Sequence, residues 1–101
     1  MIIIKYSELA EETFEQEIDF IISKWNLIES KKIAILVNDC LDTLSKSPEI
    51  GKYNALDNHY SFVISKQTNL YYKYNETLSS IELILFWNNS QNPNLLSKLL
   101  K

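Results

Sequence analysis

The sequence predicts an α+β fold in which one curved sheet packs against a helical hairpin. Two observations support this prediction: apolar residues recur at helical spacing through the first half of the chain, and they recur with a period of two through most of the second half. The chain has 101 residues, of which 46% are hydrophobic. That is enough for one modest core, so we expect a single domain spanning residues 1–101.

A short strand over residues 1–6 opens the predicted fold, because three β-branched isoleucines follow one another there. Ser7 then offers a helix N-cap, and acidic residues follow in the first turn, where the helix dipole favours them. The helix carries apolar residues at helical spacing: Ala10, Phe14, Ile18, Ile21, Ile22 and Trp25. We expect it to end near Trp25–Asn26, with Trp25 in the core.

A second helix is predicted to begin around Glu29 or Ser30 and to stop at Ser47-Pro48, because proline disfavours helical geometry in the residue before it. Its apolar stripe consists of Ile33, Val37, Cys40, Leu41 and Leu44. The connection between the two helices is short, so they form an antiparallel hairpin. Gly51 is the only glycine of the chain, and we expect it at a position that requires a positive φ.

Three strands are predicted after the hairpin, around residues 60–65, 70–74 and 81–87, with polar links at 66–69 and 75–80. Short links between successive strands make an antiparallel meander, so the order is β-α-α-β-β-β. The tail at residues 95–101 contains two leucine pairs and is predicted to form a short C-terminal helix.

Composition limits the classes of function. The chain has a single cysteine, Cys40, so an internal disulfide is excluded. One cysteine and one histidine, His59, are also too few for a Cys–His metal site, and we expect no cofactor. The apolar start ends too early for a signal peptide, and no segment approaches the length of a membrane span, so we expect a cytoplasmic protein without a membrane partner.

The charge pattern argues against a conventional nucleic-acid-binding protein. Net charge is −3, and all ten basic residues are lysines. Arginine provides the planar fork that suits phosphate, whereas lysine is a point charge. Six acidic residues and no basic residue lie between positions 8 and 19, which we interpret as the solvated face of the first helix.

Several phrases of the sequence, in this order and spacing, resemble the RelE/ParE superfamily of toxins, which includes the plasmid stabilisation proteins. They are Lys24-Trp25 at the end of the first helix, the helix-stop phrase Leu44–Gly51, Val63-Ile64, the tyrosine-rich strand Leu70–Tyr74, the last strand Ile84–Trp87, and the closing phrase Asn92–Leu96. The resemblance covers nearly the whole chain and is closer to the ParE-like branch.

The resemblance implies the toxin of a type II toxin–antitoxin system, held inactive by a cognate antitoxin. Some relatives cleave mRNA in the ribosome, and others inhibit DNA gyrase without cleaving anything, so fold alone does not choose between them. We favour a ParE-like inhibitor that arrests growth by binding an essential target such as DNA gyrase and that is not an enzyme. The alternatives are a metal-free, ribosome-dependent endoribonuclease and a decayed toxin that only binds its antitoxin. A homodimer and a toxin–antitoxin hetero-oligomer are both open.

If the protein is a nuclease, the candidate catalytic residues are His59, Lys66, Lys73 and Tyr72. The resemblance places Lys73 and His59 where relatives often carry arginine, and Asn88 where many carry histidine. Asparagine cannot titrate, so that acid–base role is lost. His59 has the plainer interpretation of a surface residue, and the tyrosines that of sheet packing.

The apolar residues of the tail have no obvious place in the core. We therefore expect the antitoxin to contact Leu95, Leu96, Leu99 and Leu100.

Overall fold

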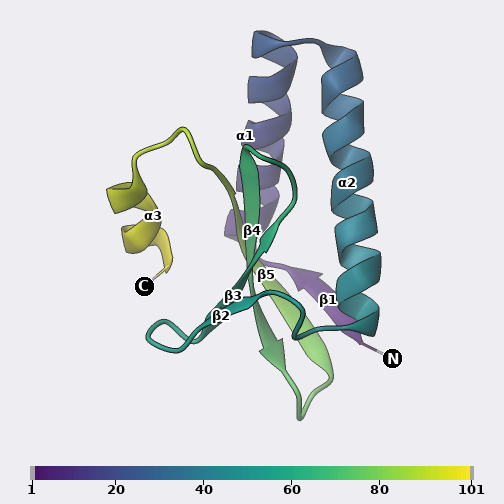
Figure 1. Ribbon diagram of the computed structural model, residues 1–101, viewed down its shortest axis with the longest axis vertical. Helices are drawn as coiled ribbons and strands as arrows, with labels where there is room; N and C mark the ends of the chain where they lie inside the picture. The colour runs from purple at the N-terminus through teal and green to yellow at the C-terminus, as the bar shows by residue number, and fades with distance from the viewer. Residues whose placement is uncertain (1, 101) are drawn as a thin grey trace.

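The computed structural model describes residues 2–100 as one five-stranded sheet with a helical hairpin and a short C-terminal helix (Figure 1). The elements in chain order are β1 (Ile3–Tyr6), α1 (Glu8–Lys24), α2 (Leu27–Lys46), β2 (Lys52–Asn54), β3 (His59–Val63), β4 (Thr68–Asn75), β5 (Ser80–Asn88) and α3 (Pro93–Leu100). The predicted α+β fold and its C-terminal helix are confirmed. Within residues 2–100, no helix is both long and apolar enough to cross a membrane.

The sheet is mixed, with the strand order β1-β5-β4-β3-β2. The first strand lies parallel to the last, and β2 to β5 follow one another as an antiparallel meander. The edge strand β2 was not predicted, because it is only three residues long, is exposed throughout and shows no alternation of burial. It adds a fourth strand to the expected meander.

The start of α1 agrees with the prediction. The hydroxyl of Ser7 accepts a hydrogen bond from the Ala10 N–H at 2.9 Å, and Glu8 and Glu11 occupy the first turn. The same hydroxyl donates to the carbonyl oxygen of Ile84 in β5 at 2.8 Å. One side chain therefore caps the helix and also fixes it to the sheet.

α2 starts earlier than predicted, at Leu27 rather than at Glu29 or Ser30. The Asn26 side chain accepts a hydrogen bond from the Glu29 N–H at 3.0 Å, so Asn26 is the N-cap and the turn between the helices is shortened. The predicted apolar stripe is confirmed: Ile33, Val37, Cys40 and Leu44 are buried, and Leu41 is half-buried.

The prediction that Trp25 lies in the core is wrong, since 53% of this residue is exposed. Trp25 is the C-cap of α1, at the tip of the hairpin, and both helices extend beyond the sheet at this end (Figure 1). Trp87 in β5, in contrast, is buried.

A bulge interrupts the pairing of β4 with β5. Tyr72 pairs with Leu83, and the residue before it in β4 pairs with Leu85, so Ile84 is an extra residue in β5. The extra residue shifts the alternation of the strand. Leu83 and Phe86, three positions apart, therefore both belong to the core.

The prediction of a positive φ at Gly51 is also wrong. The residues with positive φ are Asn58 and Ser79, in the turns before β3 and β5, and no described glycine has one. Glycine is required at position 51 by close packing instead. A Cβ atom there would lie 2.7 Å from both the Ser61 carbonyl oxygen and the Tyr72 hydroxyl oxygen.

Candidate functional site

A row of tyrosines crosses three neighbouring strands. Tyr53 of β2 pairs with Tyr60 of β3, and Tyr60 pairs with Tyr72 of β4. The ring centroids of the first pair lie 4.9 Å apart, and those of the second lie 5.1 Å apart with nearly parallel rings. Tyr72 is fully buried, whereas 49% of Tyr53 is exposed. The row, which we call the tyrosine ladder, therefore leads from the core to the solvent.

Tyr72 is the anchor of the ladder. Its hydroxyl accepts a hydrogen bond from the Gly51 N–H at 3.1 Å and donates one to the Pro48 carbonyl oxygen at 2.9 Å. Burial raises the pKa of this phenol to about 12. The sequence made Tyr72 a candidate for acid–base catalysis, and the structure places its hydroxyl between two backbone groups inside the protein.

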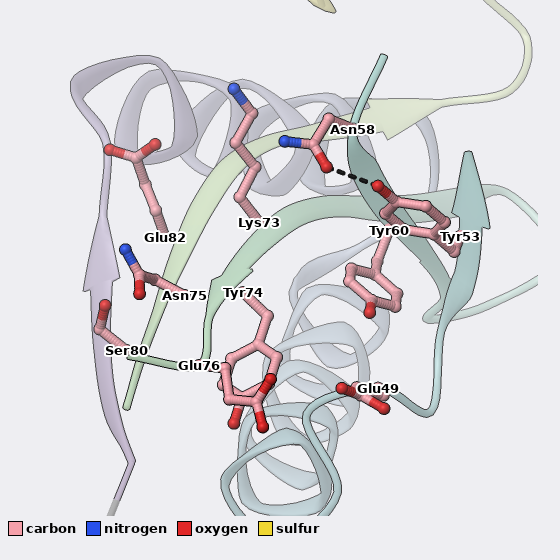
Figure 2. Close-up of a pocket in the computed structure, with 10 residues that line it drawn as sticks. All are labelled: Glu49, Tyr53, Asn58, Tyr60, Lys73, Tyr74, Asn75, Glu76, Ser80 and Glu82. Atoms are coloured by element: carbon pink, nitrogen blue, oxygen red, sulfur yellow. Dashed lines mark hydrogen bonds between the residues drawn. The ribbon is translucent and has the colours of Figure 1, made fainter. Parts of the chain in front are cut away.

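The outer end of the ladder borders a cavity of about 560 Å³ between the β2–β3 and β4–β5 ends of the sheet. Figure 2 shows Tyr60, Tyr74, Glu49 and Glu76 gathered on one side of it, with Lys73 directed to the other side. Neighbouring residues of a strand point to opposite faces, which explains why Lys73 and Tyr74 diverge.

His59 is buried at the start of β3, with 3% of its surface exposed, so the interpretation as a surface residue is wrong. Its ring meets the ring of Tyr71 edge-on at 5.5 Å, and its Nδ1 atom has no hydrogen-bond partner. With Lys52, Ser61 and Tyr71 it lines a second cavity of about 360 Å³. Hydrophobic alternation did not reveal this position, because a single histidine at a predicted strand start carries no burial signal.

The two candidate lysines lie apart. Lys73 is exposed in β4 and is paired in register with Glu82 of β5. Lys66 is exposed in the turn between β3 and β4 and lines neither of the two cavities described above. The four predicted catalytic residues therefore do not form one cluster: Lys73 and His59 line different cavities, and Tyr72 belongs to the core. Within residues 2–100, no three His, Cys, Asp or Glu side chains are grouped as a metal site would require.

Sequence reasoning missed a buried polar network where α1 crosses β5. Glu17 is only 6% exposed, although it belongs to the acidic run interpreted as solvated. Its carboxylate accepts hydrogen bonds from the Thr68 hydroxyl at 2.8 Å and from the Asn88 side-chain amide at 2.9 Å. The Asn88 oxygen in turn accepts from the hydroxyl and the N–H of Ser90. Asn88 is therefore held by structural contacts through both of its polar atoms.

Thr13 extends this network along the same helix. Its hydroxyl accepts a hydrogen bond from the Phe86 N–H at 2.9 Å and donates to the Leu9 carbonyl oxygen at 2.7 Å. β1 pairs with β5 only as far as Leu83, and beyond that point the Thr13 side chain satisfies one backbone donor, the Phe86 N–H, on the edge of β5 that β1 leaves open.

The C-terminal helix is attached lightly. None of its residues is buried, and in Figure 1 it lies on the other side of the sheet from α2. Leu95 and Leu99 line a groove of about 230 Å³ together with Phe20 of α1 and Trp87 of β5. Leu96 and Leu100 are half-buried. The four leucines that we expected to bind a partner thus stand at the surface, partly in contact with their own chain.

Comparison with solved structures identifies proteins of the same fold. A chain of the intact E. coli RelBE toxin–antitoxin complex superposes with a TM-score of 0.62, at 14% identity over 90% of this chain and 100% of that one. A YoeB/ParE toxin from Agrobacterium tumefaciens gives 0.61, at 14% identity over 87% and 99%. A chain of the heterotetrameric YoeB-YefM complex from Staphylococcus aureus gives 0.58, at 18% identity over 88% and 98%.

No protein-family model and no curated protein matches the sequence. The chain has the fold of the RelE and YoeB/ParE toxin structures over nearly its whole length, as the sequence resemblance implied. At these identities the likeness concerns the fold.

Proposed function

We propose that this protein is the toxin of a type II toxin–antitoxin pair and that it arrests growth by binding an essential target, such as DNA gyrase, rather than by cutting RNA. The toxin role is supported by the fold, which is shared over about nine-tenths of this chain with chains of toxin–antitoxin complexes. The same likeness supports a cognate antitoxin as the partner. We expect the protein to act in the cytoplasm, where such targets are found.

The choice of binding over cleavage is supported above all by Asn88. This residue stands where the resemblance leads us to expect a titratable histidine, and both of its polar atoms are occupied by Glu17 and Ser90. An amide that cannot titrate, and whose oxygen and nitrogen both hold hydrogen bonds inside the protein, supplies neither a general base nor a general acid. Lys73 is the one candidate cation in the tyrosine-rich strand, and Glu82 opposes it.

Inducing the protein alone in a bacterial host tests this proposal. We expect growth arrest with intact mRNA and altered plasmid supercoiling, and we expect co-expression of the antitoxin to restore growth. Cleavage of mRNA at particular codons would contradict the binding proposal. Unchanged growth would point instead to a decayed toxin that only binds its antitoxin.

A ribosome-dependent endoribonuclease is the second candidate, and one observation favours it. His59 is buried with an unpaired Nδ1 atom and shares a cavity with Lys52 and Tyr71. A buried polar atom without a partner is uncommon and is often associated with function. If this cavity cuts RNA, Lys52→Ala should abolish mRNA cleavage while the protein keeps its fold, because Lys52 is an exposed edge residue.

A further inference from the structure

The cavity beside the tyrosine ladder combines aromatic faces with carboxylates. Tyr53, Tyr60 and Tyr74 contribute aromatic rings, and Glu49 and Glu76 contribute negative charge from two distant segments, the loop after α2 and the turn after β4 (Figure 2). The negative face of an aromatic ring attracts cations, and a nearby carboxylate adds to that attraction. Both features favour a positively charged ligand.

Neither carboxylate has a salt-bridge partner among residues 2–100. The ion pairs in the part of the chain that the structure describes join Lys32 to Glu29 and Lys46 to Asp42. Lys73 also borders the cavity, but Figure 2 shows it directed away from Glu49 and Glu76. The negative charge on this side of the cavity is therefore not neutralised from within residues 2–100.

Charges from both segments act on the pKa of Tyr60. Burial raises the pKa of its phenol, and the negative charges of Glu49 and Glu76 raise it further. Both carboxylates thus act on one aromatic ring, although they are 27 positions apart in the sequence (76 − 49). The hydroxyl of Tyr53 is held by the Asn58 side chain, which keeps the outermost ring in place.

The chemistry of the lining separates an organic cation from a metal ion. A divalent metal requires several oxygen ligands at short range, and no grouping of three metal-binding side chains occurs in residues 2–100. Aromatic walls instead suit an organic cation: a guanidinium group is weakly hydrated and stacks on a ring, and an alkylammonium group is attracted to the face of a ring. The volume of about 560 Å³ has room for such a group together with its aliphatic stem.

We propose that this cavity binds an organic cation, a guanidinium or alkylammonium group, between the rings of Tyr60 and Tyr74 and the carboxylates of Glu49 and Glu76. A lysine or arginine side chain of a protein partner and a free polyamine both present this chemistry. The proposal stands whether or not the protein is toxic, because it concerns a different part of the sheet from Asn88.

The test uses the full chain, labelled with ¹⁵N, titrated with Nα-acetyl-arginine methylamide and separately with the neutral citrulline analogue of the same shape. We expect saturable amide shift changes at residues 49, 53, 60 and 74–76 with the arginine compound only. The Glu49→Gln/Glu76→Gln double variant should weaken binding about tenfold or more, since charge-assisted contacts are lost. Glu12→Gln, which removes one exposed charge of α1, should leave the affinity unchanged.

A thermal melt of each variant establishes that it is folded. Equal responses to arginine and citrulline, no saturable response at these residues, or full affinity in the double variant would each overturn the proposal. Two further titrations identify the source of the cation. Tighter binding of an arginine-containing peptide than of spermidine assigns the site to a protein partner, and the reverse assigns it to a free polyamine.

Discussion

Glu17 and the pair Glu49 and Glu76 place carboxylates beside the same sheet in opposite circumstances. Glu17 is 6% exposed and accepts hydrogen bonds from Thr68 and Asn88. Glu49 and Glu76 are exposed, and neither has an ion pair in the described part of the chain. Burial makes an unsatisfied polar group costly, so the first site is closed by internal partners, whereas the second can remain open to a ligand.

The buried carboxylate therefore serves the stability of the fold, whereas the exposed pair is available for binding. The end of β5 that carries Asn88 is occupied by its own hydrogen bonds, which is why we assign it to stability. The β4–β5 turn end holds charge and aromatic surface that the described chain leaves unpaired. We therefore expect substitutions at the two ends to affect different measurements.

The largest effect on stability should come from Glu17→Ala. The change leaves the Thr68 hydroxyl and the Asn88 amide buried without an acceptor, and should lower the free energy of unfolding by about 2–4 kcal/mol. Urea denaturation measures this loss. Glu12→Ala on the exposed side of the same helix is the matched control, expected within about 0.5 kcal/mol of the wild type. Equal losses in both variants would show that the hydrogen bonds of Glu17 do not contribute to the free energy of unfolding.

A smaller loss is expected from Gly51→Ala, at the buried end of the tyrosine ladder. The new methyl group would lie 2.7 Å from the Ser61 carbonyl oxygen, which belongs to the backbone and cannot move freely. Overpacking of this kind costs about 1–3 kcal/mol. Chemical denaturation, with Ala55→Ser in the exposed turn as a control, measures the cost. A variant as stable as the wild type would mean that Ser61 and Tyr72 can move to accommodate the methyl group at little cost.

The anchor of the ladder should make stability depend on alkaline pH. The folded protein raises the pKa of Tyr72 from 10.0 to about 12, and that of Cys40 from 9.0 to about 12, mainly through burial. Both groups therefore ionise first in the unfolded state. Stability is intact below about pH 9 and falls as pH rises toward 12.

The Tyr72→Phe variant measures how much of the loss of stability at alkaline pH is due to Tyr72. The variant lacks two hydrogen bonds and is expected to be less stable at pH 8 by about 1–2 kcal/mol. The gap between wild type and variant should narrow between pH 10 and 12, because only the wild type loses the contribution of Tyr72. A gap that stays constant across this range would contradict the assigned burial of the phenol.

Deletion of residues 95–101 should have the smallest effect on stability, about 1 kcal/mol or less, because no residue of α3 is buried. The same deletion should weaken binding of the antitoxin at least tenfold, if Leu95, Leu96, Leu99 and Leu100 contact it as we expect. Isothermal titration of both forms with the antitoxin compares the two effects. Unchanged affinity of the truncated protein would remove the tail from the interface.

Local sequence patterns predicted most of the fold. The hydroxyl of Ser7 next to an acidic turn specified the start of α1, and the helical spacing of Val37, Cys40 and Leu44 specified the buried face of α2. These signals are local, since a cap or a stripe is formed by residues a few positions apart. The period of two likewise predicted the three long strands.

The sequence did not predict features that depend on distant segments. Glu17 is buried because β4 and β5 provide Thr68 and Asn88, and no spacing within the acidic run indicates this. Trp25 is exposed because the helical hairpin extends beyond the sheet. This depends on the relative lengths of the helices and strands, which the local composition around Trp25 does not indicate. Likewise, the convergence of Glu49 and Glu76 on the tyrosine ladder arises only when the loop after α2 meets the β4–β5 turn.

Mapping of mRNA 5′ ends after induction of the protein alone, with growth followed in the same culture, tests the central claim most directly. We predict that growth stops while the pattern of mRNA ends stays that of uninduced cells, because Asn88 offers no acid or base and the candidate catalytic residues are not gathered in one cluster. New 5′ ends at a consistent position within codons, appearing together with the arrest, would contradict this account.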